Sequence, residues 1–120
     1  MRNHLKIALV LLLTLGGCAL TPTEVRLSGH VARYEREAPP VEVANCLERS
    51  MRDIQGNVYT WRDTLPYGRI DVGGRAEEYG TIALFEISPR DSGSLIFVYL
   101  NQQVFQTDRP KFAAEFMRPC

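Results

Sequence analysis

Few residues of this 120-residue chain combine the types and spacing that catalysis requires. Asp71, Glu77 and Glu78 could supply a carboxylate pair for acid–base chemistry, but they lie in the stretch DVGGRAEEYG, which is typical of a solvated hairpin loop. His30 lies in a segment with no sustained apolar face, where we expect a solvated side chain. The sequence contains no Ser-His-Asp arrangement, zinc-ligand cluster, P-loop or dinucleotide fingerprint. It therefore predicts a non-enzymatic protein without a cofactor or a metal.

Glycines and aromatic residues offer a second kind of site, one that binds rather than reacts. Gly73 and Gly74 could cradle a phosphate, but no helix and lysine follow them, so we interpret them as a turn. Tyr59 and Trp61 share a strand face, and Tyr67 lies in the next turn. Aromatic side chains grouped in this way can stack on a ligand, and they also commonly form the core of a small domain. We expect Trp61 to belong to the core.

The stretch Ser94–Leu100, SLIFVYL, is apolar on both faces of a strand. One alternating set of side chains should face the helices, and the other could face a partner. The sequence does not say which set does which, although the polar tip of Tyr99 favours its own face as the rim of a binding surface. The candidate binding-face residues are Ile96, Val98, Leu100 and Tyr99.

The elements that would position these residues follow from the apolar spacing. Val41–Asp53 has apolar residues on one helical face, with prolines before it and Gly56 after it. Four stretches rich in β-branched and aromatic residues follow at 57–65, 68–72, 81–87 and 94–100, and a short piece follows at 104–105. Pro110–Met117 has a helical pattern. The sequence predicts an α+β fold: an N-terminal helix packed on a four- to five-stranded antiparallel meander, with a short C-terminal helix.

The first 17 residues have the composition of a secretory signal peptide. Met1–Lys6 is basic, Ile7–Leu15 is a nine-residue run with one polar residue, and two glycines follow. The run is about half of the ~20 apolar residues that a membrane-spanning helix requires. We therefore expect residues 1–17 to be removed as a signal peptide.

Leu15-Gly16-Gly17-Cys18 resembles the lipobox of bacterial lipoproteins. The resemblance implies that Cys18 receives a diacylglycerol, that cleavage falls before it, and that the new amino terminus is acylated. An ordinary signal peptide followed by a chance cysteine is the alternative. Ala19 and Leu20 stand where an aspartate would favour the inner membrane, so the resemblance implies lipid anchoring at the periplasmic face of the outer membrane. It covers only the first 20 residues and not the folded part.

Residues 18–40 are predicted to be a flexible tether between the lipid and a domain at 41–120. Prolines and a glycine interrupt the segment, and its charges alternate without a sustained apolar face. Part of it, around Val25–Tyr34, could still add an edge strand.

With Cys18 carrying lipid, Cys46 and Cys120 are the two remaining cysteines. In the oxidising compartment that the resemblance implies, they would form a disulfide. Two unpaired thiols are the alternative. By the chain-entropy argument, a bridge across a separation of this length contributes about 4.5 kcal/mol.

Charge and anchoring together suggest the class of partner. Without Arg2 and Lys6 the chain keeps 12 basic and 14 acidic residues, too mixed a balance for nucleic acid. We expect a non-enzymatic lipoprotein, attached to the membrane through its lipid, that binds another envelope protein as an accessory or assembly factor. The alternative is a lipid-anchored binder or inhibitor of a soluble ligand or enzyme. Lysozyme-inhibitor lipoproteins have this size and at least one disulfide, but their motif residues are not matched here.

Overall fold

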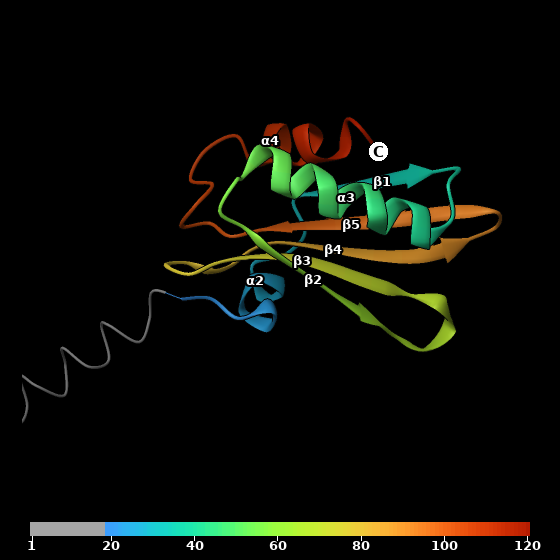
Figure 1. Ribbon diagram of the computed structural model, residues 1–120, viewed down its shortest axis with the longest axis horizontal. Helices are drawn as coiled ribbons and strands as arrows, with labels where there is room; N and C mark the ends of the chain where they lie inside the picture. Colours follow the sequence, from blue (N-terminus) through green and yellow to red (C-terminus); the bar gives the residue numbers. More distant parts are fainter. Residues whose placement is uncertain (1–18) are drawn as a thin grey trace, which may run out of the picture.

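The computed structural model describes residues 19–120 and consists of one antiparallel sheet with helices on both faces (Figure 1). The elements are α2 Pro22–Leu27, β1 Ala32–Arg36, α3 Pro40–Ile54, β2 Tyr59–Thr64, a 3₁₀ turn Pro66–Gly68, β3 Ile70–Ala76, β4 Gly80–Arg90, β5 Gly93–Leu100 and α4 Arg109–Met117. The five strands lie in the order β1-β5-β4-β3-β2. The predicted α+β fold is confirmed. The fifth strand is β1, whereas Val104 and Phe105 lie in a loop.

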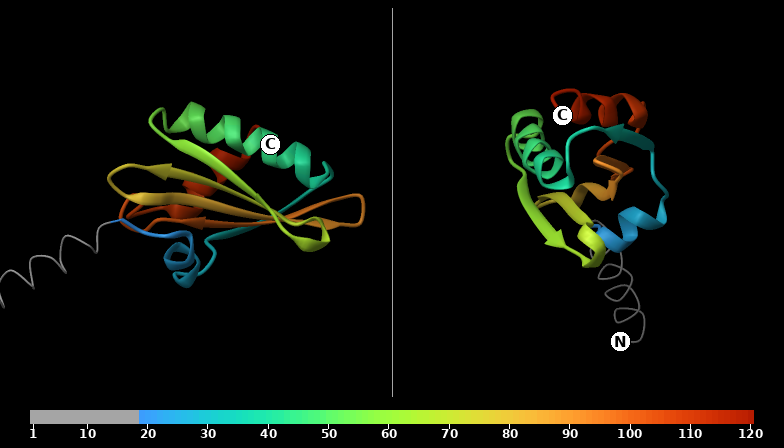
Figure 2. Two further views of the ribbon diagram at one scale, coloured as in Figure 1. Left: turned by 60° about the horizontal axis from the view of Figure 1, so that its bottom comes forward. Right: turned by 90° about the vertical axis from the view of Figure 1, so that its right-hand side faces the viewer.

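The main core lies between the sheet and the helices α3 and α4, which cover the same face (Figure 2). On α3 the buried residues recur at helical spacing: Val43, Ala44, Leu47, Ser50 and Met51. The Ser50 hydroxyl donates to the Phe116 carbonyl oxygen at 2.6 Å and joins α3 to α4 inside this core. Because apolar side chains dominate this layer, its burial is the main source of stability for the domain.

A short N-terminal segment covers the opposite face of the sheet, at the bottom of Figure 1. The helix α2 begins with a capping box, in which the Thr21 hydroxyl accepts from the Glu24 amide and the Glu24 carboxylate accepts from the Thr21 amide. Val25 of α2 is 1% exposed, and β1 pairs along its whole length with β5. The flexible tether predicted at 18–40 is therefore not what the described part of this segment forms. The edge strand expected around Val25–Tyr34 lies at Ala32–Arg36, and a helix occupies Pro22–Leu27.

The chain joins the sheet at Leu20. Its amide donates to the Tyr79 carbonyl oxygen at 3.0 Å, and its own carbonyl oxygen accepts from the Thr81 amide at 2.8 Å. Between these partners Gly80 has φ +68°, and a Cβ there would lie 2.4 Å from the Leu20 oxygen. Glycine is required at this position for both reasons.

Gly73 and Gly74 do not form the turn that we predicted, because both lie inside β3. A Cβ at Gly73 would lie 2.1 Å from the Trp61 ring, and one at Gly74 would lie 2.9 Å from the Met51 sulfur. The two glycines leave room for large side chains, one on each face of the strand. Among residues 19–120, no helix has both the length and the hydrophobicity to cross a bilayer.

Candidate functional site

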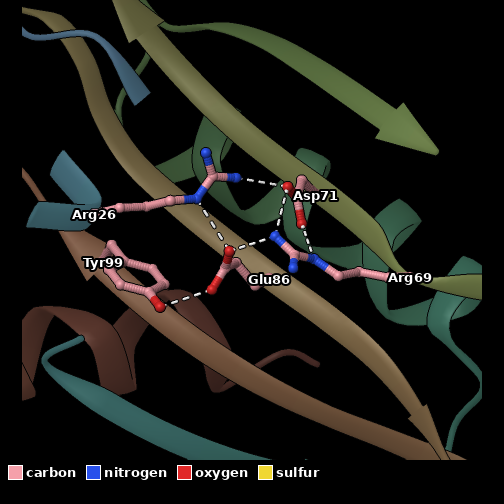
Figure 3. A network of polar contacts seen from close by, with 5 residues as sticks. All are labelled: Arg26, Arg69, Asp71, Glu86 and Tyr99. Carbon is pink, nitrogen blue, oxygen red and sulfur yellow. Dashed lines mark hydrogen bonds and ion pairs between the residues drawn. The ribbon is translucent and has the colours of Figure 1, made fainter. Parts of the chain in front are cut away.

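Five side chains form a polar cluster on the sheet face that α2 covers (Figure 3). We call this set the clasp, and it consists of Arg26, Arg69, Asp71, Glu86 and Tyr99. Arg26 comes from α2, Arg69 from the residue before β3, and the other three from β3, β4 and β5. Each strand residue is flanked by apolar neighbours that face the main core, so strand alternation places all three on the α2 face.

The two arginines bind both carboxylates of the clasp. Arg26 donates from Nη2 to Asp71 Oδ2 at 2.6 Å and from Nε to Glu86 Oε2 at 3.0 Å. Arg69 donates to Asp71 through Nε at 2.9 Å and Nη2 at 3.1 Å, and it also contacts Glu86 Oε2. The Asp71 side chain is only 4% exposed, whereas the two guanidinium side chains are about one-third exposed. A carboxylate this buried requires such paired, hydrogen-bonded partners.

Tyr99 completes the clasp from β5. Its hydroxyl donates to Glu86 Oε1 at 2.6 Å. Burial, followed by this hydrogen bond, raises the pKa of Tyr99 to about 12, so the phenol stays protonated and remains a donor. The hydrogen bond to Asp71 likewise raises the pKa of Arg69.

The clasp holds elements together and is poorly suited to proton transfer. All four carboxylate oxygens already accept hydrogen bonds: the arginines donate to both oxygens of Asp71 and to Glu86 Oε2, and Tyr99 donates to Glu86 Oε1. A general base needs an oxygen that can reach a substrate proton. The arrangement instead ties α2 to three strands.

The residues predicted to form one binding face lie on two opposite faces of β5. Ile96, Val98 and Leu100 are each 0% exposed and pack in the main core, so they do not form a surface. Tyr99 lies on the opposite face, as its polar tip suggested, but its hydroxyl is engaged by Glu86. Phe97 lies on the same face, with the His30 ring edge-on at 5.0 Å. The exposed His30 is therefore packed over the sheet and is not part of a tether.

The other candidate residues are dispersed. Asp71 belongs to the clasp, whereas Glu77 and Glu78 are exposed in the turn between β3 and β4, so the three carboxylates do not form one group. Trp61 is half-buried against Gly73, and Tyr59 is 74% exposed at the start of β2. The expected core role of Trp61 is met only in part.

Cys46 and Cys120 form the predicted disulfide, with their Cα atoms 5.6 Å apart. The bridge ties α3 to the segment after α4. Cys18 and the expected signal peptide at 1–17 lie outside the described residues.

Among the described residues, three exposed non-glycine residues have a left-handed backbone: Tyr67, Asp91 and Asp108. Aspartate adopts this conformation more readily than a bulky tyrosine does, so Tyr67 is the unusual one. Tyr67, at the tip of the turn between β2 and β3, has φ 65° and ψ 23° and is 98% exposed. The turn is closed by a hydrogen bond from the Leu65 amide to the Arg69 carbonyl oxygen at 2.8 Å. Because the Arg69 side chain is fixed in the clasp, the base of this turn is fixed to the sheet.

Sequence reasoning missed the clasp and the left-handed backbone of Tyr67. A usable signal was present: Asp71 and Glu86 are acidic residues with apolar neighbours on both sides in buried strands. Acidic residues in such positions need a basic partner. Arg69 is only two residues from Asp71, but the contribution of Arg26 depends on α2, whose docking the sequence did not reveal.

The comparisons with known proteins identified no relative of this chain. No protein-family model matches the chain, and neither curated proteins nor solved structures gave a match. In the part of the chain that the structure describes, no group of three or more His, Cys, Asp or Glu side chains is placed to hold a metal ion.

Proposed function

We propose that this chain is a non-enzymatic lipoprotein, anchored through Cys18 at the periplasmic face of the outer membrane, that binds another envelope protein. The anchoring part of the proposal is supported by the lipobox-like Leu15-Gly16-Gly17-Cys18. The binding part is carried by Tyr67, whose aromatic side chain is almost fully exposed on a turn with a fixed base.

The conformation of Tyr67 is what distinguishes it from an ordinary exposed tyrosine. A left-handed backbone costs a non-glycine residue about 1–2 kcal/mol. With 98% of its surface exposed, the side chain makes almost no contact within the domain that would offset this cost. Strained residues of this kind concentrate at binding sites, and tyrosine is enriched among the residues that dominate interface energies.

The position of Tyr67 also suits a membrane-anchored protein. The Tyr67 turn lies at the opposite end of the sheet from Leu20, where the chain enters (Figure 1). β4 joins the two ends through 11 residues, a span of about 34 Å at the usual strand rise. A partner at the Tyr67 turn would therefore be met well away from the anchor.

Paired variants test the proposal. Tyr67→Ala should keep the melting temperature, since the side chain has few contacts, but should lose co-purification of an envelope partner. Leu27→Ala, which removes another exposed apolar side chain, should keep both. A photo-crosslinking phenylalanine analogue at position 67 should give one adduct with a membrane-inserted protein, and the same analogue at position 27 should not.

Other outcomes separate the alternatives. An adduct at position 67 with a soluble periplasmic protein would favour the soluble-ligand or inhibitor function. Equal partner recovery with Tyr67→Ala and the unaltered protein would refute binding at this turn. Cys18→Ser should abolish labelling by a tagged fatty acid, and persistent labelling would refute the anchoring.

A further inference from the structure

We propose that the domain lies directly against the bilayer in one fixed orientation, with the β3–β4 turn facing the lipid headgroups. This inference rests on the proposed lipidation of Cys18. It adds an interaction surface, the end of the sheet around Leu20 and Tyr79, whose partner is the phospholipid headgroup layer.

The first argument is the length of chain available. Only Ala19 separates Cys18 from Leu20. The backbone amide and the carbonyl oxygen of Leu20 are both hydrogen-bonded to the turn at Tyr79–Thr81. A flexible lipoprotein tether would allow the domain to rotate freely, because its ends move independently. Here there is no such length, so a lipid on Cys18 would bring this turn to the membrane surface.

The second argument is that the attachment point is built to be rigid. Asn101 is fully buried and donates from Nδ2 to the carbonyl oxygens of Tyr79 at 3.2 Å and Thr81 at 2.9 Å. The backbone amide of Asn101 donates to the Ile82 carbonyl oxygen at 2.8 Å. Asn101 thus supports the turn on both sides of Gly80, where Leu20 docks. An orientation set at Leu20 is therefore transmitted to the sheet.

The third argument is the composition of this end. Tyr59 and Tyr79 are 74% and 41% exposed, and both line a groove of about 620 Å³ with Val58, Ile82 and Val104. Tyrosine is favoured at membrane interfaces because its ring is apolar and its tip is polar. Two exposed tyrosines beside the anchor fit the headgroup layer.

Charge does not supply the attraction. Glu77 and Glu78 lie in the same turn and also line the groove, so anionic headgroups would repel this end. The lipid and the Leu20 hydrogen bonds must hold it in place. Vesicle binding by the lipidated protein should accordingly change little with salt.

Fluorescence quenching tests the orientation on the lipidated protein. The probes are Tyr79→Trp and Tyr67→Trp, with Trp61 present as the same background in both. Each variant is reconstituted in phosphatidylethanolamine–phosphatidylglycerol vesicles that carry a nitroxide on the headgroup. We expect several-fold stronger quenching for Tyr79→Trp than for Tyr67→Trp. A ten-residue Gly-Ser insertion between Ala19 and Leu20 should reduce that difference while the protein stays bound to vesicles.

The outcomes distinguish this inference from the proposed function. A protein that lacks a diacylglyceryl group by mass spectrometry and does not float with vesicles refutes the anchoring, and the orientation with it. A protein that is lipidated and floats, but shows equal quenching at both positions, refutes only the orientation. Quenching at position 79 that the insertion leaves unchanged would show that the headgroups hold this end without the short link to Cys18, and would refute the rigid attachment.

Discussion

At the scale of single residues, the clasp shows how a sheet can bury acidic groups without making them reactive. Asp71 is almost fully buried, yet its two oxygens accept three hydrogen bonds from Arg26 and Arg69. Removing one member of such a group leaves the others buried without a counter-charge. The resulting loss of folding free energy exceeds the net stabilisation that the intact pair provides. The clasp is therefore sensitive to every substitution of its carboxylates.

Asp71→Asn should lower the free energy of unfolding by about 2–4 kcal/mol, less than for a fully buried pair because the arginines are partly exposed. Asp63→Asn is the matched control, since Asp63 is exposed and lies opposite Asp71 in the β2–β3 register. The control should change stability by at most about 0.5 kcal/mol. Urea unfolding measures both, and similar losses would contradict the structural role of the clasp.

The raised pKa of Tyr99 predicts a stability change at alkaline pH. Because the pKa is about 12 in the fold and about 10 when unfolded, the unfolded chain loses its proton first. The contribution is fully present below pH 10 and is lost as the pH rises towards 12. Tyr99→Phe should be less stable by about 1–2 kcal/mol at pH 8. That deficit should shrink above pH 10 in thermal melts, and a deficit independent of pH would be inconsistent with the assignment.

At the scale of elements, the two glycines of β3 make room for large side chains that pack on both faces of the strand. Gly73 admits the Trp61 ring on one face, and Gly74 admits Met51 and Val58 on the other. Glycine inside a strand loses contacts and conformational entropy, so its presence usually marks a close approach of another group. Here the close approach joins β2 and α3 to the sheet.

Gly73→Ala should destabilise the domain by about 1–3 kcal/mol, because the new methyl group would occupy the space of the Trp61 ring. Gly56→Ala is the control: a methyl group there would have no atom within 4 Å, so the substitution should be neutral or slightly stabilising. In a Trp61→Ala background the cost of Gly73→Ala should fall, which a double-mutant cycle of unfolding free energies would reveal. Additive losses would show that the ring is not the obstacle.

At the scale of the whole molecule, the disulfide joins the first helix that covers the main core to the end of the chain after the last one. Cys46 lies in α3 and Cys120 follows α4, and the two are 74 residues apart in sequence. Four of the five strands lie between them along the chain. The bridge therefore restricts most of the unfolded domain, and its effect should arise mainly from a loss of unfolded-state entropy.

The Cys46→Ala/Cys120→Ala double variant should lose about 4.5 kcal/mol in denaturant unfolding, by the loop-entropy estimate. Reduction of the unaltered protein should give a similar loss, which controls for the substitutions themselves. Alkylation of either cysteine in the unfolded, unreduced protein would show that the bridge is absent in solution.

Local patterns predict the parts of the fold that depend on local spacing. The α3 helix, the four strands of the meander and α4 each have their own apolar period, and the two downstream cysteines leave one pairing. The prediction for the N-terminal segment is wrong because that segment is held in place by distant residues and not by its own pattern. Helix α2 has only six residues and one buried side chain, Val25. Its docking depends on Asp71 and Glu86, far along the chain.

The candidate site is less predictable for the same reason. The alternation in Ser94–Leu100 is visible in the sequence, but only the position of α3 decides that Ile96 faces the core and Tyr99 does not. The turn predicted at Gly73-Gly74 is wrong because paired glycines usually mark turns, and nothing in the local sequence reveals a ring packed above them. The strain at Tyr67 is a backbone property that the Pro66-Tyr67-Gly68 sequence does not specify.

If the chain is exported as we propose, the pairing of β1 with β5 imposes an order on its folding. In a chain that crosses the inner membrane amino terminus first, residues 19–36 arrive long before β4 and β5, on which they dock. During that interval Leu20 has no turn to bind, so its backbone amide and carbonyl are not yet held by the sheet. Enzymes that modify and cleave a lipobox need such an accessible backbone. Under the proposed lipidation, the topology would leave an interval for attachment of the lipid, which ends when the last strands complete the sheet.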